Sequence, residues 1–368
     1  MAARQAHIET GPRSRRKGVE GLEAGNGFLT ASLSFTLAQG GIEMGDVIQV
    51  QDLTKFYGST LAVDHISFNI KEGEVFGFLG PNGAGKTTTI RMMVGLTQPS
   101  SGTAWVDGHN VTKETVEVKK TIGLVPETSN LYGELTALEN LIYQAELYGV
   151  LRKERRIKAS QLLEEFGLKE HQDKPFQKLS RGLKRRLTIA ATLIHHPKIL
   201  FLDEPTTGLD VMSARGLRKL ILDSKKKGLT IFLTTHYIPE AETLCDRIAV
   251  VVQGKIRIID TPENIKAQVK ETEILEIGLD RLPEDLKGLL LSLDGIEKIL
   301  IDENRIRFHV ESLNQVAFHI LKSMEDRGVK IRSINTLSPN LEDAFIRLTG
   351  LDSELMKIDK VIKGGPES

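Results

Sequence analysis

The sequence predicts an α/β domain with a largely parallel sheet, followed by a small α+β domain. Between about residues 46 and 252, apolar strand-like segments alternate with helical ones, and one of these strands runs into a glycine-rich turn. From about residue 272 the order of elements changes. We therefore divide the 368-residue chain into a disordered N-terminal extension (1–45), an α/β domain (46–270), an α+β accessory domain (271–350) and a flexible tail (351–368).

The first 45 residues differ from the rest of the chain. They are rich in Gly, Ser and Ala, and residues 13–17 form a basic cluster. Residues 18–27 are largely polar, whereas a signal peptide needs a continuous apolar segment after its basic region. We expect either a disordered extension that is dispensable for activity, or a leader that precedes a natural start at Met44.

The composition excludes several classes of protein. Lys+Arg and Asp+Glu both number 49, and this zero net charge argues against nucleic acid as a partner. A lone cysteine, Cys245, excludes a disulfide framework and a multi-cysteine zinc site, and it fits a reducing compartment. No apolar run reaches the roughly 18–20 residues that cross a bilayer, so we expect another chain to supply any membrane span.

Local patterns predict the first elements of the α/β domain. Residues 47–53 and 62–70 alternate apolar and polar side chains, which is typical of half-buried strands. Residues 75–79 form an uninterrupted apolar run, as expected for a strand buried on both faces. A glycine-rich turn follows, and a helix is predicted over residues 88–94.

The accessory domain has the order β-α-β-β-α-β, which matches a ferredoxin-like unit. Its predicted elements are a strand (273–279), a helix (282–293), a hairpin (296–310) with its turn at 302–304, a helix (312–326) and a strand (329–334). Ser312 is the expected N-cap of the second helix. One more helix follows, for which we expect Ser338 at the N-cap and Pro339 at the first helical position.

A phosphate-binding loop is the strongest chemical motif. It fits GxxxxGK[ST] and lies between a predicted strand and a predicted helix, as this motif requires. Its glycines allow backbone N–H groups to surround phosphates, and the helix N-terminus adds positive potential. We expect Lys86 to bind the β- and γ-phosphates of ATP and the Thr87 hydroxyl to ligate Mg²⁺. The loop consists of Gly80, Pro81, Asn82, Gly83, Ala84, Gly85, Lys86, Thr87 and Thr88.

Two carboxylates end an apolar strand downstream. Residues 198–202 are mostly apolar, and Asp203 and Glu204 follow. Asp203 at the strand end suits a Mg²⁺ partner, directly or through water. Glu204 lies one residue further and can orient and deprotonate an attacking water, a role worth roughly 10²–10⁴-fold in rate.

With these motifs in this order, residues 46–270 resemble the nucleotide-binding subunit of an ATP-binding cassette (ABC) transporter, which has a P-loop NTPase cassette fold with a helical subdomain. The resemblance identifies residues 80–88 as the Walker A loop and Asp203-Glu204 as the end of Walker B. It implies that Asp210, in Gly208-Leu209-Asp210, belongs to the D-loop. It also implies that His236 is the switch histidine at the γ-phosphate and that Tyr57 stacks on adenine.

Two motifs depart from the family pattern. The signature segment, usually LSGGQ, reads Leu-Ser-Arg-Gly-Leu over residues 179–183, and it keeps Ser180 and Gly182, which contact the phosphate of the opposing subunit. Lys184-Arg185-Arg186 makes the following helix unusually basic. The Q-loop has Glu127 in place of Gln, and this carboxylate can still ligate Mg²⁺. Some exporter-type members show the same features.

The resemblance implies an ATPase that powers an exporter. Each ATP would lie between the Walker A loop of one subunit and the signature helix of another, so the chain pairs with itself or with a related ATPase subunit. A separate transmembrane permease docks near residues 127–180, which places the chain in the cytoplasm, peripheral on the inner face of the cell membrane. The alternative is a soluble ABC-type ATPase in translation or DNA repair. A GTPase is not favoured, because it would need an NKxD-like guanine motif, which the sequence lacks.

Overall fold

The structure is a computed structural model that describes residues 45–268, 273–281, 295–302, 304–310, 312–337 and 340–350. The predicted N-terminal extension (except Gly45), the predicted helix over 282–293 and the predicted tail lie outside the described residues, so these three expectations stay predictions.

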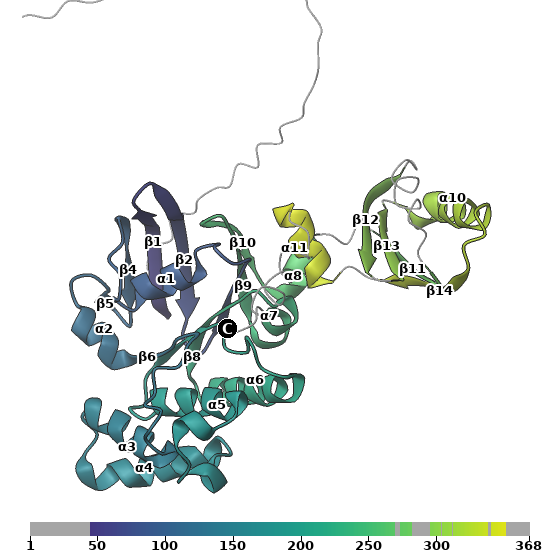
Figure 1. Ribbon diagram of the computed structural model, residues 1–368. Coiled ribbons are helices and arrows are strands. Elements are labelled where there is room, and N and C mark those ends of the chain that lie inside the picture. Colours follow the sequence, from purple (N-terminus) through teal and green to yellow (C-terminus); the bar gives the residue numbers. More distant parts are fainter. Residues whose placement is uncertain are drawn as a thin grey trace, which may run out of the picture. The chain divides into compact units, whose positions relative to one another are not determined.

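A six-stranded sheet forms the centre of the α/β domain, as predicted. Its strand order is β10-β9-β3-β8-β7-β6, and all neighbours are parallel except β9 and β10. Figure 1 shows helices beside this sheet, among them α1 (Lys86–Met93), α5 (Arg181–Thr192) and α6 (Val211–Lys226). The strands are β3 (Val75–Leu79), β6 (Ile122–Val125), β7 (Ile199–Asp203), β8 (Thr230–Thr235), β9 (Arg247–Val252) and β10 (Lys255–Asp260).

A second, antiparallel sheet packs against the first. It has the order β2-β1-β4-β5, with β1 (Asp46–Tyr57), β2 (Thr60–Lys71), β4 (Ser101–Val106) and β5 (His109–Asn110). The alternating pattern of residues 47–53 and 62–70 predicted two strands correctly. It did not predict that β1 and β2 belong to a separate antiparallel sheet. Phe68 of β2 stacks on Phe76 of β3, with ring centroids 5.4 Å apart, so aromatic side chains join the two sheets.

Opposite faces of the parallel sheet bury different side chains. Phe201 and Phe232 face the antiparallel sheet, whereas Leu200 and Leu202 face the helices, because successive strand residues point to opposite sides. The helices are α1 (Lys86–Met93), α2 (Thr115–Thr121), α3 (Ala137–Leu147), α4 (Arg152–Glu165), α5 (Arg181–Thr192), α6 (Val211–Lys226), α7 (Ile238–Leu244) and α8 (Pro262–Ala267). None of the helices in the described ranges is both long and apolar enough to cross a membrane.

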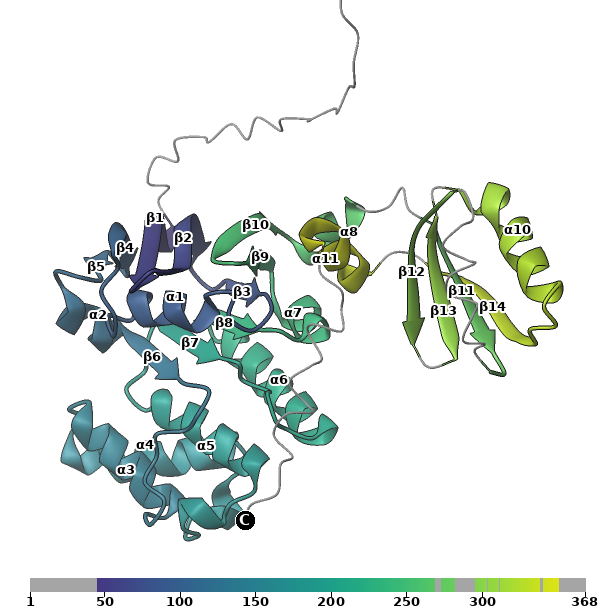
Figure 2. The same ribbon diagram turned by 45° about the horizontal axis from the view of Figure 1, so that its top comes forward.

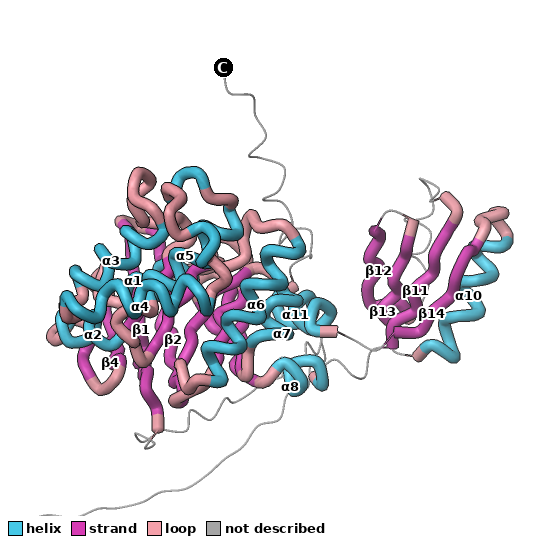
Figure 3. Tube along the Cα trace, turned by 90° about the horizontal axis from the view of Figure 1, so that it is seen from below, coloured by secondary structure: helices cyan, strands magenta, loops and turns pink. Residues whose placement is uncertain are grey.

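The accessory domain contains a four-stranded antiparallel sheet with the order β12-β13-β11-β14. This strand order is that of the predicted ferredoxin-like unit, and the small C-terminal sheet domain is thereby confirmed. Figures 2 and 3 show α10 (Leu313–Glu325) along this sheet, and its Val316, Ile320 and Met324 share a core with strand residues such as Phe308. The strands are β11 (Glu273–Leu279), β12 (Ile296–Asp302), β13 (Arg305–Val310) and β14 (Ile331–Leu337).

The starts of the last two helices differ from the predictions. Ser312 occupies the N-cap of α10, but its side chain makes no capping hydrogen bond. The final helix, α11 (Leu341–Thr349), begins two residues later than predicted, and Asn340 is its N-cap in place of Ser338. Asn340 and Asp343 form a reciprocal capping box, which satisfies two backbone N–H groups at once. Leu341, Ala344 and Phe345 belong to the hydrophobic cluster of the α/β domain.

Candidate functional site

The phosphate loop has a backbone that requires its glycines. Gly83 and Gly85 have φ values of 76° and 98°, in the left-handed region that favours glycine. A Cβ on Gly80 would lie 2.2 Å from the carbonyl oxygen of Val251, and one on Gly85 would lie 2.5 Å from that of Ala62. Gly85 is the N-cap of α1 and no side chain caps this helix, so its first N–H groups are available to an anion.

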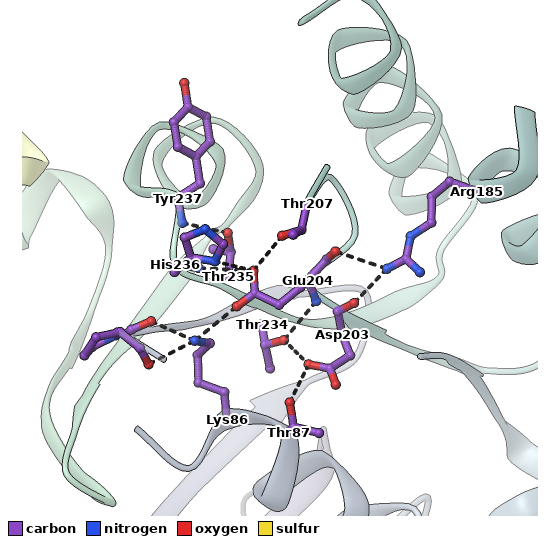
Figure 4. A network of polar contacts seen from close by, with 12 residues as sticks. Lys86, Thr87, Arg185, Asp203, Glu204, Thr207, Thr234, Thr235, His236 and Tyr237 are labelled. Carbon is purple, nitrogen blue, oxygen red and sulfur yellow. Dashed lines mark hydrogen bonds and ion pairs between the residues drawn. The ribbon is translucent and has the colours of Figure 1, made fainter. Parts of the chain in front are cut away.

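Lys86, Glu204 and His236 form a polar cluster in which Lys86 and Glu204 are buried and His236 is partly exposed (Figure 4). The Lys86 ammonium donates hydrogen bonds to the carbonyl oxygens of Gly80 (2.8 Å) and Pro81 (3.1 Å), and it lies 3.1 Å from Glu204 Oε1. The other oxygen, Oε2, is 2.8 Å from His236 Nδ1. Burial alone would raise the pKa of Glu204, but the hydrogen bond from His236 and the charge of Lys86 lower it to about 2. Glu204 is therefore a carboxylate at neutral pH.

The backbone of Glu204 is in an unfavourable conformation. Its φ is 47°, which places a non-glycine residue in the left-handed region. Such a residue costs of order 1–3 kcal/mol and persists only where its surroundings fix it. Here the Glu204 N–H donates to the carbonyl oxygen of Thr234 (3.2 Å) and to its hydroxyl (3.1 Å). The Thr207 hydroxyl donates to the carboxylate at 3.2 Å.

Thr87 and Asp203 adjoin one another at the start of α1 and the end of β7. The Thr87 hydroxyl donates to Asp203 Oδ1 at 3.1 Å, and the Thr234 hydroxyl donates to the same oxygen at 2.6 Å. Within the described residues, no group of three or more His, Cys, Asp or Glu side chains could hold a metal. A hydroxyl beside one carboxylate fits Mg²⁺ that takes its remaining ligands from phosphates and water.

A cavity of 430 Å³ brings most of the predicted residues together. It is lined by Tyr57, Ala62, Asn82, Gly83, Gly85, Lys86, Thr87, Thr88, Glu127, Glu204, Thr207 and His236. Tyr57 ends β1 and is 48% exposed, with the Lys55 ammonium 5.2 Å from its ring centre. Glu127 follows β6 and is exposed. A larger cavity of 490 Å³ lies at the opposite ends of β7 and β8, where no motif residue lines it.

Ser180, Gly182 and Asp210 do not line this cavity. Ser180 is the N-cap of α5 and accepts a hydrogen bond from the Leu183 N–H (3.3 Å), and Asp210 caps α6 through the Ser213 N–H (2.9 Å). A Cβ on Gly182 would lie 2.5 Å from Ser213 Oγ. Gly182 therefore has a role within the chain, because it lets α5 pack closely against α6.

Sequence reasoning missed Arg185, which it treated only as part of a basic helix. The side chain is 7% exposed, and its guanidinium donates to backbone carbonyl oxygens of the Q-loop and of the turn after β7. Its spacing offered a signal: it lies three residues after Gly182 and four before Ile189, on the buried face of α5. A charged residue on such a face needs a partner inside the fold.

Protein families and known proteins with similar sequences agree with this geometry. Residues 63–207 match the family "ABC transporter", and residues 261–349 match "ATP-binding protein DrrA1-3-like, C-terminal domain". The linearmycin resistance ATP-binding protein LnrL of Bacillus subtilis (strain 168) is 35% identical over 306 residues, which cover 83% of this chain and 98% of that protein. The bacitracin transport ATP-binding protein BcrA of Bacillus licheniformis is 35% identical over 321 residues, with the same two coverages.

The chain belongs to the ABC transporter ATP-binding family. Among solved structures, a dimeric ATP-binding cassette in a post-hydrolysis state with ADP and Pi is 28% identical, has a TM-score of 0.54, and covers 58% of this chain and 98% of its own. The family confirms the prediction of an ATP-binding and ATP-hydrolysing subunit of an ABC exporter. Such ABC subunits dimerise and work with membrane permeases. The alternative of an ATPase in translation or DNA repair is not favoured.

Proposed function

We propose that this ABC subunit binds Mg-ATP in the 430 Å³ cavity and hydrolyses it there. The Tyr57 ring stacks on adenine, and the backbone N–H groups of residues 80–88 hold the phosphates. Lys86 already lies beside the loop carbonyl groups, so it meets the β- and γ-phosphates without a large movement. Mg²⁺, held by Thr87, Asp203 and Glu127, would neutralise part of the phosphate charge.

Glu204 acts as the general base in this proposal. Its low pKa keeps it ionised, and its carboxylate faces the end of the phosphate loop. When ATP draws the Lys86 ammonium towards the phosphates, Glu204 can accept the proton of an attacking water. His236 holds Glu204 Oε2 through Nδ1 at 2.8 Å, and it binds the γ-phosphate when the nucleotide is present. The contact between Lys86 and Glu204 carries this proposal, because it joins the phosphate loop to the base.

The proposed pairing with a second ATPase subunit follows from the signature and D-loop residues, which do not line the cavity. Ser180, Gly182 and Asp210 lie outside it, so they serve the ATP of a second subunit, which is another copy or a related chain. A separate transmembrane permease docks near Glu127 and the helical subdomain, where Leu147, Leu151 and Ile157 are about 60% exposed. The chain is thereby cytoplasmic and peripheral on the inner face of the membrane. The names of LnrL and BcrA favour an antibiotic as the exported compound.

Two measurements test the proposed function. Phosphate release from ATP by the purified chain should require Mg²⁺ and stop in excess chelator; equal rates in both would contradict the Mg²⁺ assignment. The chain should sediment with membranes when it is co-expressed with a permease encoded by a neighbouring gene, and stay in the supernatant without it. Sedimentation that does not depend on the permease would contradict the docking assignment.

A further inference from the structure

We propose that Arg185 is a positioning residue for hydrolysis, which ties the signature helix to the Q-loop and to the turn that carries Glu204. This inference rests on the proposed role of Glu204 as the base. Arg185 does not itself line the cavity, but it binds the backbone carbonyl groups of Glu127 and Glu204, which do, so it would act through the backbone of these residues.

The guanidinium of Arg185 reaches two segments that are far apart in the sequence. On the turn after β7 it donates to the carbonyl oxygens of Asp203 (2.7 Å), Glu204 (3.2 Å) and Pro205 (2.9 Å). On the Q-loop it donates to those of Pro126 and, at 3.2 Å, Glu127. One side chain therefore joins both segments that bring a carboxylate to the cavity (Figure 4 shows its contacts with the turn).

The contact with Glu204 supports a strained backbone. Glu204 has a φ of 47°, and its N–H is already fixed by Thr234. Arg185 Nη2 holds the carbonyl oxygen of the same residue at 3.2 Å, so the peptide groups on both sides of this residue are fixed. Without this bond, the turn can relax towards an ordinary conformation and rotate the Glu204 carboxylate away from the attacking water.

The arrangement needs an arginine. The Arg185 guanidinium donates hydrogen bonds to backbone carbonyl groups of two segments, which lie on two sides of this planar group. A lysine ammonium carries the same charge but has three donors on a single atom, so it cannot reach both segments in this geometry. The charge is balanced at longer range by the carboxylates of Asp203, Glu240, Glu127 and Glu204.

Arg185 also lies on the helix that Ser180 caps. Arg181–Thr192 is one continuous helix, so a shift of its N-terminus moves the guanidinium with it. When Ser180 contacts the second subunit's ATP, a shift of this helix would therefore change the positions of the Glu127 and Glu204 backbones in the same chain. This gives the two nucleotide sites of the dimer a mechanical link through one side chain.

The test compares Arg185→Lys and Arg185→Gln with wild type and with Arg247→Lys. Arg247 is a matched control, because its guanidinium also binds a backbone carbonyl group, that of Asn69 (3.3 Å), but it lies at the start of β9, outside the cavity lining and the proposed docking region. The measurements are the dissociation constant for ATP, the thermal unfolding midpoint, and turnover per bound nucleotide. We expect both Arg185 variants to bind ATP within about threefold of wild type and to lose about 10- to 100-fold in kcat. Arg247→Lys should keep its kcat.

The split between binding and kcat decides the outcome. A kcat of Arg185→Lys within about threefold of wild type would overturn the proposal. So would unfolded Arg185 variants, or a loss of ATP binding as large as the loss of kcat, because each would assign Arg185 a structural role. A wild-type chain that binds ATP without hydrolysing it would overturn the proposed function, and this inference with it. Normal wild-type turnover with an unaffected Arg185→Lys would overturn the inference alone.

Discussion

In the proposed dimer the chain contributes two halves of a nucleotide site, and they are built differently. In the cavity half, functional side chains bond to one another: Lys86 pairs with Glu204, and Thr87 donates to Asp203. In the signature half, Ser180 and Asp210 accept hydrogen bonds from N–H groups of the helices that they cap. The cavity half is thus organised by contacts between distant segments, whereas the signature half consists of two helix N-termini that their own side chains cap.

Because the two halves are built differently, substitutions in them should have different effects on ATP binding and hydrolysis. Changes in the cavity half should affect the chain's own ATP, because its charges are buried and mutually dependent. Changes in the signature half should affect hydrolysis only through the second subunit. Four variants test this contrast, and we take them from the largest expected effect to the smallest.

Lys86→Ala should abolish ATP binding or hydrolysis while the fold survives. It removes the cation that faces the phosphates and leaves Glu204 buried without its ammonium partner. Equilibrium binding of ATP and steady-state turnover, alongside circular dichroism, measure this. Undiminished turnover would contradict the phosphate-loop assignment.

Glu204→Gln should keep ATP binding and lose about 10²–10⁴-fold in hydrolysis, because the amide cannot take the proton of water. With Mg-ATP, the variant should accumulate as a closed dimer, since the contacts across the interface remain. Size-exclusion chromatography with and without Mg-ATP shows the change. A variant that stays monomeric in the presence of its pairing partner and Mg-ATP would count against the mechanism.

Ser180→Ala should reduce hydrolysis while ATP binding by the isolated chain stays at the wild-type level. The loss of an N-cap also costs about 1 kcal/mol of stability. Thr136→Ala is the matched control, because Thr136 caps α3 through the same kind of bond and lies outside the cavity. If both variants lose the same fraction of turnover, the effect comes from helix capping and the signature half has no separate role.

Glu127→Gln should have the smallest effect. The amide oxygen can still ligate Mg²⁺, so turnover at saturating Mg²⁺ should persist with a weaker dependence on the ion than wild type shows. Glu127→Ala should lose more turnover, and it should also weaken coupling to transport. Rates measured against free Mg²⁺ for the three proteins decide the matter. Three superimposable curves would place Glu127 away from the metal.

Local motifs account for the parts of the site that were predictable. Strand β3, the loop after it and helix α1 are contiguous, so the sequence pattern reports their geometry directly. Asp203 and Glu204 were identified because they end an apolar strand. The final helix shows the limit of this reasoning: Ser338-Pro339 matched a helix start, but Asn340 forms a better cap with Asp343. Two competing local signals cannot be ranked without their hydrogen bonds.

The fold class and the order of the motifs could be predicted from the sequence, since they depend on neighbours along the chain. Three features become visible only in the folded chain: β1 and β2 form a separate antiparallel sheet, Glu204 has a left-handed backbone, and Gly182 packs on Ser213. The same holds for the hydrogen bonds by which Arg185 joins the Q-loop to the turn after β7. The Arg185 contacts join residues 18 to 59 positions apart, so the spacing along α5 indicates that Arg185 is buried but not which carbonyl groups it reaches.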